Sequence, residues 1–389
     1  MPEDLHIRVL TSTQDVAAET WNNLANPSGQ GFNPFLTHEF FTALEKSGSA
    51  TAQTGWLGQH LLLENEAGKA LGLMPLYLKN HSYGEYVFDH AFADALERAG
   101  GRYYPKLQAS VPFTPATGPR LLAPQALKPY LLKGADELCH ARQASSIHLT
   151  FLPQQDWQEF GDDTAWLKRT DTQFHWHNEN YQGFDDFLAS LSSAKRKNLR
   201  KERANATASD IEIKWLTGND LKESHWDAFY EFYMDTGSRK WGRPYLTREF
   251  FSLINETMAE HILLVMAYRE GRAIAGALNF IGSDTLFGRN WGAIEHHPFL
   301  HFELCYYQAI DFAIAKGLKT VEAGAQGQHK LARGYVPCPT FSLHHFTNES
   351  LSRAAAQYLR AERLAVAEGQ QELAAHAPFR KARPPGQFT

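Results

Sequence analysis

The sequence predicts an α/β protein made of two tandem copies of one module, each with a mixed, mostly antiparallel sheet wrapped by helices. The main observation is a repeat: residues 34–44 read PFLTHEFFTAL and residues 244–254 read PYLTREFFSLI. The segments that follow, 59–78 and 260–281, each place a Gly-centred turn between two apolar runs, which is typical of a β-hairpin. An ordered repeat of helix and hairpin predicts that both segments fold alike; the alternative is two unrelated segments that are similar by chance.

Length and composition agree with two domains and exclude several classes of protein. The chain has 389 residues, more than one hydrophobic core usually serves, and 43% of them are hydrophobic. A net charge of -5 gives no global attraction to nucleic acid, so a polyanion site would have to be a local patch. Three widely spaced cysteines argue against a disulfide framework or a zinc site, and we expect no bound metal. Because no signal peptide or membrane span is visible, we expect a cytoplasmic protein.

The first module is expected to cover residues 1–165. Its repeated helix has Thr37 as a plausible N-cap. Residues 81–120 are rich in Gly, Pro and aromatic side chains, and a long irregular segment in a compact domain is usually functional. The other expected elements are a strand (7–10), a helix through Trp21, a helix (124–143) and a strand (146–151).

The second module is expected to cover residues 166–349, followed by a terminal helix and tail (350–389). It should begin with a crossing segment through WHNENYQGF (176–184). The further expected elements are a helix (185–204), a strand (211–216), the repeated helix and hairpin, a strand (284–293), a helix (300–316), a strand (320–325), a loop (326–337) and a strand (341–346). This order is that of an α/β unit with a mostly antiparallel sheet.

Three segments carry a resemblance to known proteins. They read GGRYYPKL (100–107), LHFELCYYQAI (300–310) and GAQGQHKLARGY (324–335), and they are similar to a bacterial family described as peptidoglycan biosynthesis or recognition proteins. The order of elements resembles the GNAT acyltransferase fold, and the duplication resembles the Fem-type subgroup, in which two GNAT-like domains are fused. The resemblance covers nearly the whole chain. It implies transfer of an acyl or aminoacyl group to an amine, with a cell-wall precursor as acceptor.

The segment where a GNAT protein would hold acyl-CoA departs from the expected pattern. The cofactor pyrophosphate normally lies on a Gly-rich turn at a helix N-terminus. Here the turn before the helix 300–316 reads IEHHPFL (294–300), without a glycine, and Phe299, Leu300 and Phe302 are expected to crowd the opening. We therefore expect weak binding of acetyl-CoA and no tightly bound cofactor. By resemblance, Fem-type enzymes also lack a working turn and use aminoacyl-tRNA; acyl-CoA is the alternative donor.

Glu303 is the most unusual residue of the helix 300–316. An apolar stripe runs along this helix, and Glu303 projects onto it. A carboxylate that points inward needs polar partners, or its pKa rises. Glu303 is therefore a candidate general base, or an anchor for a substrate amine, with Lys330 and Arg333 as compensating charges. The alternative is a structural acid that pairs with an arginine.

Polar side chains gather in and around the loop 326–337. They are Glu322, Gln326, Gln328, His329, Lys330, Arg333 and Tyr335. Cations beside His and Gln suit the binding of a carboxylate or phosphate and the stabilisation of an oxyanion. Lys330 and His329 are predicted to be catalytic with Glu303. Substrate binding is predicted for Gln326, Arg333, Tyr335, Tyr306 and Tyr307. The alternative is a solvated surface loop.

Two further groups are predicted to bind substrate. Arg289 and Trp291 alternate with Phe287 on the strand 284–293, and the alternative for Trp291 is a core position. In the first module, Asp89 and Lys106 are expected to line a cleft between the modules, together with His90, Arg102, Tyr103 and Tyr104. The alternative for this segment is a packing lid.

The helix 185–204 carries a run of cations, SAKRKNLRKER (193–203). Three leucines form its expected buried face: Leu188, Leu191 and Leu199. The cations predicted for the opposite arc are Arg196, Lys197, Arg200, Lys201 and Arg203. Such an arc fits the phosphates of tRNA or an anionic lipid surface; the alternative is a solvated helix.

The sequence therefore predicts a transferase that moves an acyl or aminoacyl group onto an amine. Two alternatives stay open. One is an acyl-CoA-dependent N-acetyltransferase, and the other is a non-catalytic protein that recognises peptidoglycan.

Overall fold

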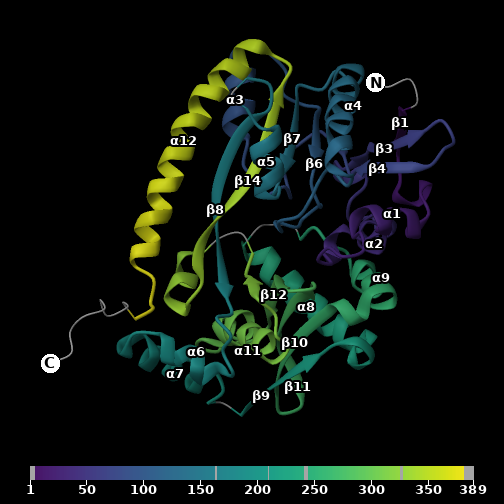
Figure 1. Ribbon diagram of the computed structural model, residues 1–389. Helices are drawn as coiled ribbons and strands as arrows, with labels where there is room; N and C mark the ends of the chain where they lie inside the picture. Colours follow the sequence, from purple (N-terminus) through teal and green to yellow (C-terminus); the bar gives the residue numbers. More distant parts are fainter. Residues whose placement is uncertain (1–4, 163, 209, 241–243, 325–326, 381–389) are drawn as a thin grey trace.

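One sheet of eleven strands runs through both predicted modules. The computed structural model describes residues 5–162, 164–208, 210–240, 244–324 and 327–380 (Figure 1). The strands are β1 (Leu5–Leu10), β2 (Leu57–Gly58), β3 (His60–Asn65), β4 (Ala70–Met74), β5 (Tyr77–Lys79), β6 (Lys106–Ala109), β7 (Ser146–Thr150), β8 (Leu167–His177), β9 (Ile211–Leu216), β10 (Ile262–Arg269), β11 (Arg272–Ile281), β12 (Thr285–Ala293), β13 (Thr320–Glu322) and β14 (Val336–Phe346). The large sheet has the order β2-β5-β6-β7-β14-β8-β13-β12-β11-β10-β9, and a small sheet has the order β1-β3-β4.

Helices cover the sheet and join its strands. They are α1 (Ala18–Ala25), α2 (His38–Lys46), α3 (His90–Arg98), α4 (Lys128–Ala141), α5 (Gln154–Phe160), α6 (Phe184–Ser190), α7 (Ser193–Ala206), α8 (Glu223–Lys240), α9 (Arg248–Met258), α10 (Leu300–Phe302), α11 (Gln308–Ala315) and α12 (Glu349–Ala375), with a π-helical turn, η7 (Glu303–Tyr307), between α10 and α11. The long α12 lies along β8 and β14 (Figure 1). No helix in the described part of the chain is long and apolar enough to cross a membrane.

The two repeated segments fold alike, as the sequence predicts. α2 begins after Thr37, whose hydroxyl accepts a hydrogen bond from the backbone N–H of Phe40, and α9 begins after Thr247, which accepts from Phe250 in the same way. The hairpins β3–β4 and β10–β11 follow these helices. The same three steps in the same order confirm the duplication.

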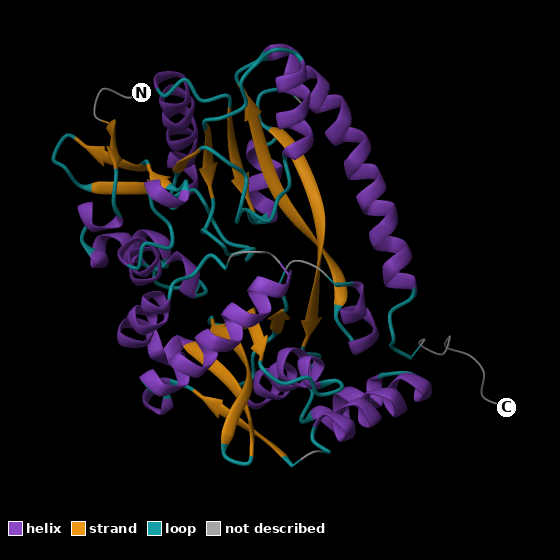
Figure 2. Ribbon diagram, turned by 180° about the vertical axis from the view of Figure 1, so that it is seen from behind, coloured by secondary structure: helices purple, strands orange, loops and turns teal. Residues whose placement is uncertain are grey.

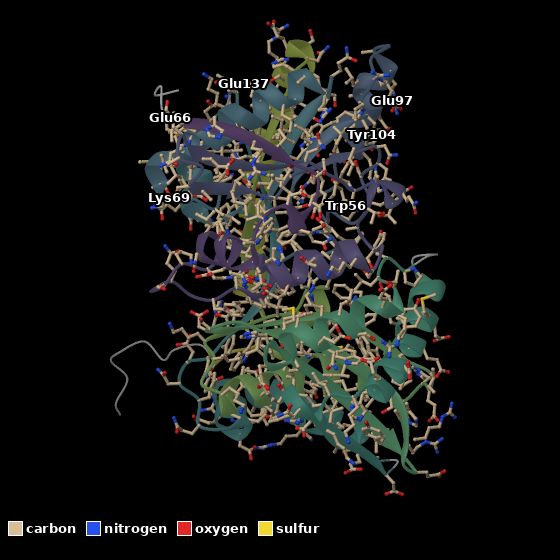
Figure 3. All side chains as sticks on the ribbon, turned by 90° about the vertical axis from the view of Figure 1, so that its right-hand side faces the viewer. Trp56, Glu66, Lys69, Glu97, Tyr104 and Glu137 are labelled. Carbon is tan, nitrogen blue, oxygen red and sulfur yellow. The ribbon has the colours of Figure 1, made fainter. Side chains whose placement is uncertain are left out.

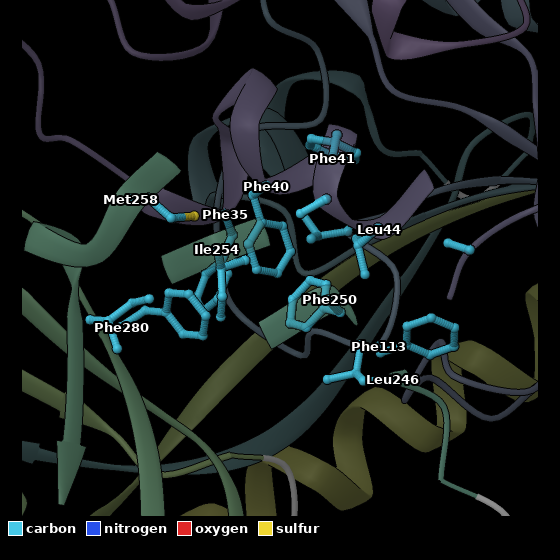
Figure 4. Packing of buried hydrophobic residues seen from close by; sticks show 14 of the residues in the cluster. Phe35, Phe40, Phe41, Leu44, Phe113, Leu246, Phe250, Ile254, Met258 and Phe280 are labelled. Carbon is cyan, nitrogen blue, oxygen red and sulfur yellow. The ribbon is translucent and has the colours of Figure 1, made fainter. Parts of the chain in front are cut away.

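The two copies also pack against each other. Phe40 and Phe250 hold the same place in the repeat, and their rings meet edge to face with centroids 5.8 Å apart. The hydroxyl of Thr247 donates to the carbonyl of Ser47 at 3.0 Å. Figure 4 shows both phenylalanines in one apolar cluster with Phe280. The repeated helices therefore build a core that both modules share, and the modules lie one above the other around it (Figure 3).

Strands are exchanged between the modules. Each module has one parallel pair joined through a helix: β6 and β7 through α4, and β12 and β13 through α10–α11. The strand that follows each pair enters the sheet beside the other module, because β8 pairs with β13 and β14 pairs with β7. β8 and β14 also pair with each other and run from one module to the other (Figures 1 and 2). The boundaries at residues 165 and 349 stay predictions, since this exchange leaves no single cut through the sheet.

Several predicted elements need correction. Residues within the expected connection from 166 form the strand β8, and its mostly polar sequence LKRTDTQFHWH gave no apolar run to mark it. The expected helix 185–204 is divided into α6 and α7 around Leu191. The segment 81–120 is less irregular than expected, because it contains α3 and β6.

Candidate functional site

The second module has an open groove where its parallel strands are joined. Residues 294–299 connect β12 to α10 and line a groove of about 670 Å³, together with Trp291, His301 and Phe302. The three bulky residues that were expected at this opening, Phe299, Leu300 and Phe302, all line the groove. Leu300 is buried, whereas Phe299 is 36% exposed and adopts a left-handed backbone (φ 66°).

The corresponding connection of the first module fills the seam between the modules. This connection, residues 110–127, joins β6 to α4, and most of its first half is buried. Its backbone contacts side chains of β8 and β12: the carbonyl of Phe113 accepts a hydrogen bond from Arg289 at 2.7 Å, and that of Pro115 accepts from Gln173 at 2.8 Å. The first module therefore supplies a wall beside Arg289 and Gln173.

Glu322 lies at this wall, at the end of β13. Its side chain is buried, accepts a hydrogen bond from the backbone N–H of Thr117, and interacts electrostatically with Arg289 and Arg120. Burial raises the pKa of Glu322 to about 8, although the two arginines act in the opposite direction. A carboxyl group with such a pKa can both accept and donate a proton near neutral pH.

Arg289 interacts electrostatically both with this carboxyl group and with Lys330. The ammonium group of Lys330 is buried and donates to the carbonyl of Gly324 at 3.0 Å. Burial lowers its pKa to about 8; Cys305 acts in the opposite direction, and Arg289 lowers the pKa further. Burial also lowers the pKa of Arg289. Two cations with weakened solvation are suited to hold an anion or a developing oxyanion.

His329 connects the loop to the groove. Its Nε2 atom lies 2.9 Å from the hydroxyl of Tyr306, and its ring packs near those of His301 and Phe302. Tyr335 donates to the carbonyl of Tyr306 at 3.2 Å. These predicted site residues therefore gather at one end of η7, next to the groove.

Glu303 has different partners from those expected. Its carboxylate accepts hydrogen bonds from Arg203 at 2.8 and 3.1 Å and from Gln308 at 2.8 Å. Gln308 reaches Glu303 because the π-helical turn brings residues five apart onto one face. Arg203 also contacts Asp311 at 2.7 Å. These contacts match the structural alternative, and the catalytic role of Glu303 stays a prediction.

Arg333 and Tyr307 also bind the cationic helix rather than Glu303. Arg333 donates to Glu202 at 2.9 Å and to the carbonyl of His329 at 2.7 Å, and its guanidinium lies 3.4 Å from the ring centre of Phe302. The hydroxyl of Tyr307 donates to the same Glu202 carboxylate. Glu202 and its neighbour Arg203 therefore anchor α7 to η7, and the prediction that places Arg203 on the free cationic arc is wrong.

The remaining cations of α7 lie toward solvent. Lys197, Arg200 and Lys201 are exposed and Arg196 is half-buried. Arg200 forms an exposed ion pair with Asp185 of α6 at 2.9 Å. This face can meet a polyanion, but it is less purely cationic than the helix sequence alone indicates.

Asp89 and Lys106 are buried in a network of charges inside the first module, and their role in substrate binding stays a prediction. The buried ammonium group of Lys106 donates to Glu85 at 2.6 Å and also to Asp89, which accepts from Tyr103 at 2.7 Å. Trp56 and Tyr104, both labelled in Figure 3, border this cluster through Lys79 and Ser82. These charges are paired with one another inside the first module.

Some site residues could not be assigned from the sequence. Gln326 lies outside the described residues. Glu322 stands among the predicted loop residues without a role, because burial and arginine neighbours come from distant segments. A structural signal points to the same place: Tyr86, Phe113 and Phe151 adopt left-handed backbone conformations near the seam, which is unusual for aromatic residues.

In the described part of the chain, no group of three or more His, Cys, Asp or Glu could hold a metal ion.

Comparison with known proteins agrees with this architecture. The chain matches the FemAB-like family, described as peptidoglycan biosynthesis/recognition, over residues 12–381. Among solved structures, FemX is 12% identical, with a TM-score of 0.53 over 88% of this chain and 98% of that chain. L-PGS from Bacillus licheniformis is 9% identical, with a TM-score of 0.50 over 87% of this chain and 99% of that chain.

A third structure has a similar degree of likeness. The C-terminal domain of a putative lysylphosphatidylglycerol synthetase from Agrobacterium fabrum is 8% identical, with a TM-score of 0.53 over 89% of this chain and 96% of that chain. No curated protein sequence matches the chain. At these identities the structures establish the fold alone, which is the predicted tandem GNAT-like fold. The family match covers nearly the whole chain, and the protein belongs to the FemAB-like family.

Proposed function

We propose that the protein is a transferase that moves an acyl or aminoacyl group onto an amine of a cell-wall or lipid acceptor. The observation that carries this proposal is a buried carboxyl group, Glu322, whose pKa is raised to about 8 and which interacts with Arg289. Arg289 also interacts with Lys330, and it lies on β12, two residues before Trp291 of the open groove. Membership of the FemAB-like family supports the same reaction class.

The proposed reaction centre divides the chemistry among three residues. The acceptor amine attacks the carbonyl carbon of the donor, and Glu322 accepts the proton that the amine loses. Lys330 and Arg289 stabilise the tetrahedral oxyanion. The bond to the leaving oxygen or sulfur then breaks, and Glu322 returns the proton to the leaving group. Thr117 holds the carboxyl group in place through its backbone N–H.

The donor is proposed to lie in the groove lined by residues 294–299. Trp291 and His301 supply its aromatic wall, with ring centroids 5.1 Å apart. His329 and Tyr306 extend this wall toward the loop. Glu303 is proposed to position η7 through Arg203, so that a change at Glu303 acts on the site indirectly.

The donor class is decided by a direct transfer assay. The purified protein is incubated with labelled aminoacyl-tRNA or labelled acyl-CoA and with either a peptidoglycan precursor or phosphatidylglycerol vesicles. Transfer of label to one acceptor is the expected result. If aminoacyl-tRNA is the donor, replacing Arg196, Lys197, Arg200 and Lys201 by Ala should weaken its binding and flatten the salt dependence of that binding. Binding of peptidoglycan fragments without transfer from any donor would instead identify a recognition protein.

A further inference from the structure

We propose that a small cavity beside the reaction centre is a subsite for an ammonium group of the substrate. The cavity has a volume of about 210 Å³ and lies where the segment 86–88 meets β8 and β14. It is smaller than the pockets that hold whole drug-sized molecules, so it fits a part of a substrate about the size of an amino-acid side chain. The existence of this subsite does not depend on the proposed function. Only the assignment of the ammonium group to the donor or to the acceptor rests on it.

Aromatic side chains dominate the cavity wall. They are Tyr86, Phe88, Phe151 and Phe174. The faces of aromatic rings attract cations, and several rings around one small volume are the usual way to bind an ammonium group. Phe151 and Phe174 are buried, while Phe88 is 55% exposed and stands at the entrance.

Two of these aromatic residues adopt a strained backbone. Tyr86 has a φ of 59° and Phe151 a φ of 57°, in the left-handed region that bulky residues rarely adopt. Such strain persists only where surrounding contacts hold it, and it gathers at ligand sites. Here it places one ring from each of two distant segments on the same cavity.

One exposed carboxylate on the cavity wall has no cationic partner among the residues that the structure describes. Asp171 accepts a hydrogen bond from the backbone N–H of Thr172 at 2.7 Å and forms no ion pair with any described residue. The nearest arginine on the same strand, Arg169, is already bound to Glu362 through two hydrogen bonds of 2.8 Å. An unpaired carboxylate next to aromatic rings favours a cation and disfavours an anion.

Two other polar side chains of the wall, Gln173 and Thr172, already have partners. The side chain of Gln173 donates to the carbonyl of Pro115 at 2.8 Å, and its oxygen lies 3.2 Å from Nε2 of His175. The hydroxyl of Thr172 accepts from Gln370 of α12 at 2.9 Å. Besides the hydroxyl groups of Tyr86 and Thr340, the wall offers a carboxylate and aromatic rings, and these suit an ammonium group.

The cavity adjoins the proposed reaction centre through two residues. Tyr86 interacts electrostatically with Arg289, the partner of Glu322. On the other side, Gln173 leads along β8 to His175, which pairs in register with Glu322 of β13. Tyr86 and β8 therefore connect the cavity wall to the two residues, Arg289 and His175, that neighbour Glu322.

The binding experiment uses one charged probe and one neutral isostere. Nα-acetyl-L-lysine amide and Nα-acetyl-L-norleucine amide are titrated into the full-length protein, and binding is followed by calorimetry or by NMR. We expect the lysine compound to bind at least about tenfold more tightly, since only it carries the ammonium group. Equal binding of the two compounds, or no binding of either at millimolar concentrations, would overturn the proposal.

Matched variants locate the probe. Asp171→Asn and Phe88→Ala each should weaken binding of the lysine compound by about tenfold. Asp94→Asn removes an exposed acid of α3 that does not line the cavity, and it should have no effect. If Asp171→Asn and Asp94→Asn bind the lysine compound equally, the cavity is not the site.

The transfer assay then separates this inference from the proposed function. An increase in KM for the acceptor in Asp171→Asn assigns the ammonium group to the acceptor, and an increase for the donor assigns it to the transferred amino acid. Selective binding of the lysine compound without any transfer would remove the proposed function and leave the subsite. Normal transfer by Asp171→Asn, with both KM values unchanged, would remove the subsite and leave the function.

Discussion

The two copies of the module differ most in the connection between their parallel strands. After β12 the connection is short, lies at the surface and lines a groove of about 670 Å³. After β6 the connection is longer, and its backbone is used by side chains of the other module: Phe113 accepts from Arg289 and Thr117 donates to Glu322. The same topological place is thus open in one copy and filled in the other.

This difference shows how a duplicated fold can produce one site rather than two. The filled copy uses its connection to contact Arg289 and Gln173, and it thereby contributes a wall to the neighbour. The shared core around Phe40 and Phe250 keeps the two copies in a fixed relation, so that the wall stays in place. Function is therefore expected where the internal symmetry is broken.

The largest expected effect comes from Glu322, which the two copies build together. Glu322→Gln keeps the size of the side chain and its hydrogen bond to Thr117 but cannot accept a proton, so kcat should fall by about 100- to 10,000-fold. Turnover of the parent protein should rise with pH up to about 8, where Glu322 loses its proton, and this rise should vanish in the variant. Rates measured from pH 5 to 10 test this; an unchanged pH profile in the variant would assign the base elsewhere.

Glu322 should also make the stability of the protein depend on pH. Its pKa in the folded protein is about 8, raised by burial from an ordinary value of 4.5, so the neutral form is favoured in the folded state. The stabilisation is fully present below about pH 4.5 and is lost as the pH rises through about 8. The parent protein should therefore lose stability relative to Glu322→Gln across this range, which thermal denaturation at several pH values measures. Parallel stability curves for the two proteins would contradict a buried neutral carboxyl group.

The shared core gives the next largest effect. Phe40→Ala and Phe250→Ala each remove a buried ring, and each should lower the free energy of unfolding by about 3–5 kcal/mol. Because the rings touch, the double variant should lose less than the sum of the two single losses. Urea denaturation of the four proteins gives the coupling. Additive losses would mean that the two copies stabilise themselves independently.

The sequence predicted what is local and repeated. The threonine caps, the repeated helices and the hairpins follow from short patterns that both copies carry. The exchange of β8 and β14 could not be predicted, because pairing between distant strands leaves no local pattern in their sequences. For the same reason the sequence indicated Glu303 by its place on a stripe but could not identify Arg203 as its partner. The burial of Glu322 could not be predicted either, because the segments that cover it are distant in the sequence.

Two arginines of α7, a helix of the second module, allow a matched comparison of a buried and an exposed ion pair. Arg203→Ala leaves the buried Glu303 without its ion pair, and the free energy of unfolding should fall by about 3 kcal/mol. Arg200→Ala removes an exposed pair with Asp185, and the loss should stay below about 1 kcal/mol. Equal losses in urea denaturation would mean that α7 is not held through Glu303. A catalytic Glu303 would show itself if Glu303→Gln kept stability and binding but lost turnover.

The smallest expected effect concerns the open groove, the feature that the first copy lacks. Trp291 is half-buried and lines the groove beside His301, so Trp291→Ala removes contact area for the donor while leaving Glu322 and its neighbours in place. The KM for the donor should rise by about tenfold, with kcat nearly unchanged, because the lost contact is made equally before and during the reaction.

Phe299→Gly should act in the same direction, since it removes a second groove side chain and also relieves a left-handed backbone. Tyr358→Ala, which removes an exposed aromatic side chain of α12 that is not part of the groove, should leave both constants unchanged. A rise in the KM for the acceptor instead of the donor would place the acceptor, and not the donor, in the open groove.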